Sequence, residues 1–183
     1  MKNSKDNLNV EKNEKKVKSM WRELFETVVS AGIIAFIIIT FIGQVTVVKG
    51  ASMEDTLFNS ERLICNKIVY RITEPKHGEI VIFKPPIDQN HNYIKRVIAV
   101  EGDKVKIVDG TVYLNGEQLE EDYIEHRSYE TMPEIIVPED SYFVLGDNRS
   151  NSSDSRFWGF VPEKNIIGRA SVVFWPITHA RMP

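Results

Sequence analysis

Residues 27–48, TVVSAGIIAFIIITFIGQVTVV, form an uninterrupted run of 22 residues without a formal charge. A helix rises about 1.5 Å per residue, so a helix of this length would extend about 33 Å. The hydrocarbon core of a bilayer is about 30 Å thick. We therefore expect residues 27–48 to form a single membrane-spanning helix, with the segments on either side of it on opposite faces of a membrane.

The charges around this run predict its orientation. Residues 1–26 carry seven basic and five acidic side chains, whereas Lys49 is the only basic residue between the run and Arg62. Basic residues that flank a membrane span tend to remain in the cytoplasm. We expect a single-pass protein of the cell membrane, with a basic cytoplasmic tail over 1–26 and an extracytoplasmic domain over 49–183 on the outer face.

Two other interpretations of the run are a cleavable signal peptide and a buried core helix. A signal peptide has an apolar core of about 7 to 15 residues after a short basic start, and both parts are longer here. A core helix rarely remains uncharged over this length in so small a domain. The membrane anchor is the interpretation that the sequence favours.

The composition of residues 49–183 limits the partners and cofactors of this domain. The segment has the length of one domain and carries 16 basic and 21 acidic residues, which argues against nucleic acid as a partner. Cys65 is the only cysteine, so we expect it to be buried and expect no disulfide or thiolate metal site. The four histidines have no metal-ligand spacing, and we expect no metal site. Nothing in the sequence specifies an oligomeric state.

Hydrophobic alternation with a period of two dominates the same residues. The apolar segments are short, rich in β-branched and aromatic side chains, and bounded by turn residues. Asp-Gly at 109–110 and Asn-Gly at 115–116 are typical of hairpin turns. We predict a mainly β fold, in which the N-terminal helix precedes an antiparallel β-sheet domain. The expected strands are RLICNKIVY, EIVIF, YIKRVIAV, KVKIV, TVYL, EIIVP, YFVLG and SVVFW.

Ser52, in the segment GASMEDTL, is a candidate nucleophile close to the end of the apolar run. The small residues Gly50 and Ala51 before it allow a tight backbone turn, which can direct an amide N–H toward a reacting carbonyl. A serine also needs a base. This segment alone is therefore weak evidence for catalysis.

Lys95, in YIKRVIAV, is the candidate base. If it faces inward among Ile94, Val97 and Ile98, desolvation disfavours the ammonium form and lowers the pKa of the lysine. A neutral amine would then be available near neutral pH. The alternative is that Lys95 or Arg96 is the solvent-facing member of an alternating strand.

Residues 146–162, GDNRSNSSDSRFWGFVP, have the composition of a loop held by hydrogen bonds from side chains to the backbone. Asp147 or Asn148 can begin an Asx turn, and Asp154 and Arg156 can form a salt bridge. A calcium loop is excluded by spacing, since basic or hydroxyl residues occupy positions that need carboxylate ligands or glycine. An ordinary surface turn is the other interpretation.

Four segments together follow the order and spacing of one family's motifs: GASMEDTL, HGEIVIF, YIKRVIAVEGD and VLGDNRSNSSDSRFWGFVP. They resemble the type I signal peptidases, membrane-anchored serine/lysine proteases that remove signal peptides from exported preproteins. The resemblance covers nearly all of residues 20–176. It implies a serine endopeptidase with an antiparallel β catalytic domain, no cofactor, and preprotein signal peptides and membrane lipid as partners.

The resemblance also implies roles for individual residues. Ser52 corresponds to the nucleophile, Lys95 to the general base, and Ser152 to a serine that hydrogen-bonds the lysine. Asp154 and Arg156 correspond to a pair that braces the site. The turn that supports the family's active site corresponds to Gly146, Asp147 and Asn148.

The family's substrate binds as an added strand, with small side chains at positions −3 and −1. Main-chain bonds give affinity in this mode and alternate pockets give specificity. The residues that correspond to the pocket walls are Val48, Met53, Leu57 and Ile94.

The sequence departs from the family's pattern at three places. Asp55 replaces a usual proline, and its carboxylate would either pair with Lys95 and hold it protonated or cap a local turn. Residues 99–103 replace a Gly-x-Pro-Gly-Asp segment. Gly50 replaces a serine that in some members contributes a hydroxyl to the oxyanion hole, so it can offer only its backbone N–H.

Two other classes of function are compatible with parts of the chain. A non-catalytic, membrane-tethered relative would hold exported peptides without cutting them, and only Asp55 favours it. A penicillin-recognising acyl enzyme needs a lysine three residues after the serine, where this chain has Asp55, and is excluded.

Four aromatic residues could form an interfacial apolar surface or pack in the core: Phe157, Trp158, Phe174 and Trp175.

Overall fold

The computed structural model describes residues 20–36, 43–54 and 56–183. The chain divides into two compact units, Met1–Phe41 and Ile42–Pro183. In the first unit residues 20–36 are helical and exposed. No helix in the described ranges combines the length and the apolarity that crossing a bilayer requires.

The prediction of one helix over 27–48 is wrong at both ends. The helix already includes residues 20–26, which we expected in the tail, and Gly43–Val47 forms strand β1. Residues 37–42 lie outside the described part. β-Branched side chains at 45 to 47 favour an extended backbone, and β1 pairs along its full length with β2. The β-rich unit therefore begins before the expected residue 49.

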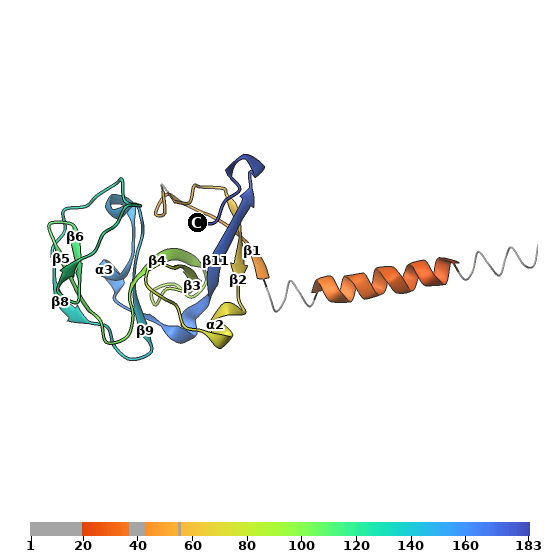
Figure 1. The fold of residues 1–183 in the computed structure, drawn as a ribbon, viewed down its shortest axis with the longest axis horizontal. Coiled ribbons are helices and arrows are strands. Elements are labelled where there is room, and N and C mark those ends of the chain that lie inside the picture. The colour runs from red at the N-terminus through yellow and green to blue at the C-terminus, as the bar shows by residue number, and fades with distance from the viewer. Residues whose placement is uncertain (1–19, 37–42, 55) are drawn as a thin grey trace, which may run out of the picture. The chain divides into compact units, whose positions relative to one another are not determined.

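The second unit is built from two antiparallel sheets (Figure 1). The larger sheet has the order β1-β2-β11-β3-β4-β9-β10, and the smaller sheet has the order β7-β6-β5-β8. Every pair of neighbouring strands is antiparallel. The prediction of a mainly β, antiparallel domain is confirmed.

The strands of the larger sheet are β1 (Gly43–Val47), β2 (Arg62–Asn66), β11 (Ile166–Trp175), β3 (Ile80–Phe83), β4 (Tyr93–Ala99), β9 (Ser141–Leu145) and β10 (Val161–Pro162). The strands of the smaller sheet are β7 (Glu117–Gln118), β6 (Thr111–Leu114), β5 (Lys104–Val108) and β8 (Met132–Ile136). The helical elements of this unit are α2 (Val69–Ile72), η2 (Arg149–Asn151), α3 (Ser155–Trp158), η3 (Glu163–Asn165) and η4 (Ile177–His179).

Alternation in the sequence explains which strands lie at the surface. In β5 Val105 and Ile107 are buried and the residues that alternate with them are exposed, so this strand packs on the core with one face. In β4 every residue from Ile94 to Ala99 is buried, which makes it a central strand covered on both faces. The hairpin between β5 and β6 turns at Asp109 and Gly110, both with positive φ, as the Asp-Gly signal predicts.

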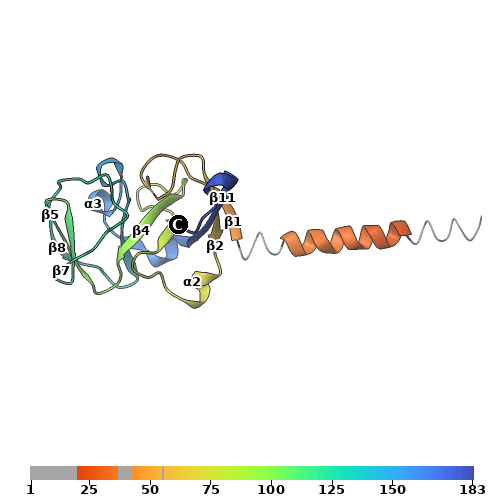
Figure 2. The same cartoon turned by 45° about the horizontal axis from the view of Figure 1, so that its top comes forward.

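The domain has two lobes, one around β5, β6 and β8 and the other around β1, β2 and β11, with β4 running between them (Figures 1 and 2). Separate apolar clusters fill these lobes, and Cys65 is buried in the cluster under β1 and β2. The segment that carries Ser52 follows β1, and Lys95 lies on β4. The fold thus brings the candidate nucleophile and base from an edge strand and a central strand to one place.

Candidate active site

Ser52 lies in a tight turn between β1 and β2. Gly50 begins this turn with a φ of 89°, a backbone conformation that residues other than glycine rarely adopt. The Glu54 N–H donates to the Ala51 carbonyl, and the Leu57 N–H donates to the Met53 carbonyl. These local bonds fix the backbone on both sides of the serine.

Lys95 extends from β4 to this turn. Its Nζ lies 2.5 Å from Ser52 Oγ, which is hydrogen-bonding distance. The lysine is only 3% exposed, so it is not the solvent-facing residue of the alternative interpretation. The structure therefore brings together a hydroxyl and an amine that are 43 residues apart in sequence.

Burial decides the protonation of this lysine. Desolvation lowers the pKa of Lys95 to about 8, although the carboxylates of Asp154 and Asp147 oppose this shift and Arg156 adds to it. No carboxylate in the described ranges forms an ion pair with Lys95. Asp55, the residue expected to pair with it or to cap a turn, lies outside those ranges. A substantial fraction of the amine is thus neutral near pH 8.

Asp154 and Arg156 form the salt bridge that the loop sequence suggested. Arg156 Nε donates to Asp154 Oδ1 at 2.8 Å, and Asp154 is completely buried. The other carboxylate oxygen of Asp154 accepts from the Gly146 N–H. Arg156 also donates to the Arg149 carbonyl within the loop and to Glu130 in the segment before β8, so it ties the loop to that segment.

Arg96, which the sequence interpretation did not assign to the site, is the partner of Asp147. The two side chains form a bidentate pair with distances of 2.9 and 2.6 Å, and both are buried. The guanidinium also donates to the Gly78 carbonyl and lies 3.9 Å from the ring centre of Tyr123. Successive side chains of a strand point to opposite faces, so Lys95 and Arg96 leave β4 in opposite directions.

A second unassigned pair holds the same loop. Arg149 is buried, donates to the carboxylate of Glu121, and donates through Nε to the Gly146 carbonyl at 2.9 Å. The Asn148 N–H donates to the Ser52 carbonyl at 3.2 Å, which ties the loop to the serine turn. Of the expected supporting turn, Asn148 therefore bonds directly to the serine turn, whereas Asp147 bonds to Arg96 on β4.

Gly146 is required by close approach. A Cβ at this position would lie 2.2 Å from Ser152 Oγ and 2.4 Å from the Ser52 carbonyl oxygen. The expected hydrogen bond from Ser152 to Lys95 is absent, because the buried Ser152 Oγ has no partner in the described part of the chain. Its hydroxyl lies against the Cα of Gly146 instead.

Two backbone amides near Ser52 differ in availability. The Gly50 N–H donates to Asn59 Oδ1 at 3.0 Å, so the expectation that it serves an oxyanion hole is wrong. The Ser52 N–H has no acceptor among the described residues. This amide is therefore available to bind a developing oxyanion.

The pair opens into a cavity of about 710 Å³. One wall comes from β1 and the serine turn, and the other comes from the start of β4 and the residues before it. Val48, Met53 and Ile94 line this cavity, as expected for pocket residues. Leu57 does not, because its side chain is fully buried in the cluster behind them.

The four candidate interfacial aromatics divide between surface and core. Phe157 and Trp175 are 65% and 50% exposed. Trp158 packs against the core cluster around β3 and β9, with its ring centre 6.0 Å from that of Phe83. Phe174 lies partly buried on β11.

Comparison with known families identifies the class to which this arrangement belongs. Residues 21–175 match the family described as signal peptidase, peptidase S26. The chain belongs to this family. Members of the S26 family are serine peptidases, so the enzyme class implied by the motifs is confirmed.

Several S26 relatives are similar over most of their length. A protein named probable signal peptidase I-2 from Synechocystis sp. is 45% identical over 172 residues, which cover 91% of this chain and 78% of the relative. Signal peptidase I T from Bacillus subtilis is 37% identical, with 96% of each chain covered. A crystal structure of a signal peptidase I from Enterococcus faecalis has 32% identity and a TM-score of 0.50, and the match covers 55% of this chain and 99% of that chain.

Replacing Gly146 by Ala should destabilise the domain, because the new methyl group would contact Ser152 Oγ and the Ser52 carbonyl oxygen at 2.2 and 2.4 Å. Overpacking of this kind lowers the free energy of unfolding by about 1 to 3 kcal/mol, which urea unfolding of the detergent-solubilised protein can measure. Removing the Ser152 hydroxyl as well should restore only part of the loss. Gly43→Ala is the control, since its nearest neighbour would be 3.4 Å away. Equal stability of the Gly146 and Gly43 variants would contradict the close approach.

Proposed function

We propose that this signal peptidase cleaves signal peptides from exported preproteins with Ser52 as the nucleophile and Lys95 as the general base. The observation that carries the proposal is the 2.5 Å distance between Lys95 Nζ and Ser52 Oγ in a buried setting. The lowered pKa of Lys95, about 8, leaves a substantial fraction of the amine neutral near that pH, as a general base requires.

The first step of the reaction acylates the serine. Lys95 Nζ takes the proton from Ser52 Oγ while this oxygen attacks the carbonyl carbon of the signal peptide's last residue. The Ser52 N–H stabilises the oxyanion of the tetrahedral intermediate. When the intermediate collapses, the C–N bond breaks, the ammonium of Lys95 returns a proton to the leaving amine, and an ester to Ser52 remains.

The second step returns the enzyme to its starting state. Lys95, neutral again, takes a proton from a water molecule whose oxygen attacks the ester carbonyl. Collapse of this second intermediate breaks the ester bond and returns the proton to Ser52 Oγ. This is the serine-lysine variant of the catalytic triad, in which one amine serves as both base and acid.

Substrate binding follows from the edge strand β1. Within the described part of the chain only β2 pairs with it, so its other edge has N–H and C=O groups available along one wall of the cavity. An extended peptide can add to this edge as a further strand. Its alternate side chains would then face Val48, Met53 and Ile94, where the family implies small residues at −3 and −1.

We also propose that the segment before β1 anchors the enzyme in the cell membrane. The anchor would cross the membrane once, with the N-terminus in the cytoplasm and the β domain on the outer face. The helical residues 20–36 support it, because Val28, Ile33 and Phe36 are 63%, 55% and 67% exposed. Lipid is the natural surrounding of such side chains. A signal peptide embedded in the same bilayer would present its cleavage site near that surface.

Replacing either member of the pair should abolish cleavage. Ser52→Ala and Lys95→Met should each lower kcat/KM on a signal-peptide substrate by at least about a thousandfold, and the double variant should lose little more, because the two residues act as one unit. Turnover by the purified, detergent-solubilised protein is the measurement.

The controls for these variants are Ser171→Ala on β11 and Lys106→Met on β5, which lie outside the cavity. Both should keep nearly normal turnover. If Lys95→Met retained normal turnover as well, the assignment of the base would be wrong.

Activity should rise with pH through about 8, the pKa of Lys95, because only the neutral amine accepts the serine proton. Asp154 raises this pKa, so Asp154→Asn should move the rising limb of the kcat/KM profile to lower pH, by up to about one unit. Glu134→Gln on the exposed face of β8 should leave the limb unchanged. A limb that moves to higher pH in Asp154→Asn would refute the electrostatic coupling.

A further inference from the structure

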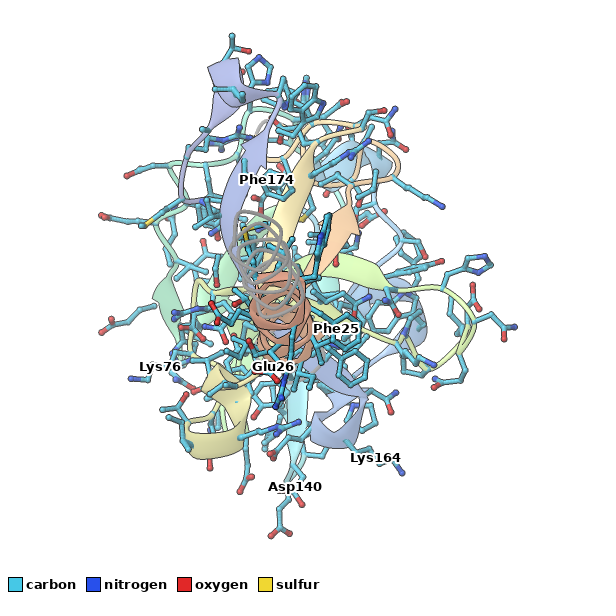
Figure 3. All side chains as sticks on the ribbon, turned by 90° about the vertical axis from the view of Figure 1, so that its right-hand side faces the viewer. Phe25, Glu26, Lys76, Asp140, Lys164 and Phe174 are labelled. Carbon is cyan, nitrogen blue, oxygen red and sulfur yellow. The ribbon has the colours of Figure 1, made fainter. Side chains whose placement is uncertain are left out.

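A second cavity of about 650 Å³ lies in the β domain and shares no residue with the cavity beside Ser52. It is formed by the segment after α2, the loop after β4, the start of β9 and η3. Figure 3 shows two of its residues, Lys76 and Asp140, toward one end of the domain and Phe174 on β11 toward the other. The lining residues are Glu74, Pro75, Lys76, His77, Val100, Glu101, Asp140, Ser141, Tyr142 and Glu163.

The lining of this cavity is strongly acidic. It includes the carboxylates of Glu74, Glu101, Asp140 and Glu163, and none of them forms an ion pair within the described ranges. Lys76 is one basic residue of the lining, and His77, the other, contacts Asp103 at 2.6 Å. The negative charge of the cavity is therefore largely uncompensated by the protein.

Tyr142 adds an observation that is independent of the charges. Its side chain is 5% exposed and its ring packs in the apolar cluster around β3, β4 and β9. Its hydroxyl has no hydrogen-bond partner among the described residues, and it is not one of the fully enclosed polar atoms. A buried phenol normally finds a partner for its O–H, and this hydroxyl is open only on the side of the cavity, so it can bond a group that binds there.

The electrostatics of Tyr142 are consistent with this orientation. Burial raises its pKa to about 12, with further increases from Glu163, Glu74, Asp140 and Glu101. The phenol is therefore neutral at physiological pH and can accept a hydrogen bond from a cationic N–H. It stands at the floor of the cavity, and the carboxylates are more exposed around it.

The spread of the acidic groups excludes a compact metal centre of protein ligands. No group of three or more histidine, cysteine or acidic side chains in the described part of the chain could hold a metal ion together. A larger cation with several N–H donors can contact separate carboxylates at once. A guanidinium presents such donors in a planar arrangement, and an ammonium presents three.

We propose that this second cavity binds an organic cation, through a guanidinium or primary ammonium group that donates to the Tyr142 hydroxyl and to the surrounding carboxylates. The site goes beyond the proposed peptidase reaction and does not depend on it. The cation is either a basic side chain of a peptide or a free polyamine, since both present the same N–H donors.

Isothermal titration of the full-length, detergent-solubilised protein tests this proposal with three probes: acetyl-Ala-Arg-Ala-amide, the same peptide with citrulline for arginine, and spermidine. We expect the arginine peptide, spermidine or both to bind, with affinity that falls as salt is added. The citrulline peptide, which has a similar shape without the charge, should not bind. Preference for the arginine peptide identifies a side chain as the ligand, and preference for spermidine identifies a free polyamine.

Variants locate the binding in the cavity. Glu74→Gln combined with Glu163→Gln should weaken binding at least about tenfold, a loss of about 1.4 kcal/mol, and Tyr142→Phe should weaken it without changing the ring that packs in the core. Glu117→Gln and Glu134→Gln, on the smaller sheet, should retain the affinity and control for overall charge. Cleavage of a signal-peptide substrate should be unchanged in the double glutamine variant.

Three results would overturn the proposal. They are absence of binding by both cationic probes, equal binding of the citrulline peptide, and equal weakening in the control variants. Glu74 and Glu163 are exposed, so replacing them by Gln should not change the thermal stability. The double glutamine variant therefore still tests the proposal if Tyr142→Phe lowers the thermal stability.

Discussion

The burial of Lys95 beside Ser52 is the interaction on which the rest of the site depends. An ammonium group in apolar surroundings loses its hydration, and this loss lowers the pKa of Lys95 to about 8. A nearby carboxylate in direct contact would reverse the effect. The two aspartates that raise the pKa of Lys95, Asp147 and Asp154, instead form ion pairs with Arg96 and Arg156. The positive charge of each arginine largely offsets the effect of its aspartate on the lysine.

These two buried ion pairs also explain the shape of the site. The Arg96–Asp147 pair joins β4 to the loop that begins at Gly146, and the Asp154–Arg156 pair joins the start of α3 to Gly146 through the second carboxylate oxygen of Asp154. The loop also bonds to the Ser52 carbonyl through the Asn148 N–H. Replacing a buried ion pair by apolar residues often leaves stability unchanged, whereas removing one partner is costly. The pairs thus hold the loop in one arrangement rather than adding much net stability. That arrangement sets the distance between Ser52 and Lys95.

The sequence predicted the antiparallel β fold because the strands alternate with a period of two and the hairpins turn at Asp-Gly and Asn-Gly. It did not predict where the uncharged run changes from helix to strand, because Val45, Thr46 and Val47 suit both an apolar helix and a strand. Periodicity also could not identify Arg96, whose partner Asp147 is 51 residues away in sequence. The motif resemblance, rather than spacing, suggested that Ser52 and Lys95 meet. Local sequence contains no information on such long-range contacts.

The central claim is that burial lowers the pKa of Lys95 to about 8, so that a substantial fraction of its amine is neutral near that pH, and a direct titration tests it. The protein would be labelled with ¹⁵N at lysine Nζ, solubilised in detergent and followed by NMR as the pH rises, with Lys95→Met identifying the resonance. We predict a midpoint at about pH 8 for Lys95. A midpoint near the ordinary lysine value of about 10.4 would contradict the account, because the serine would then have no base.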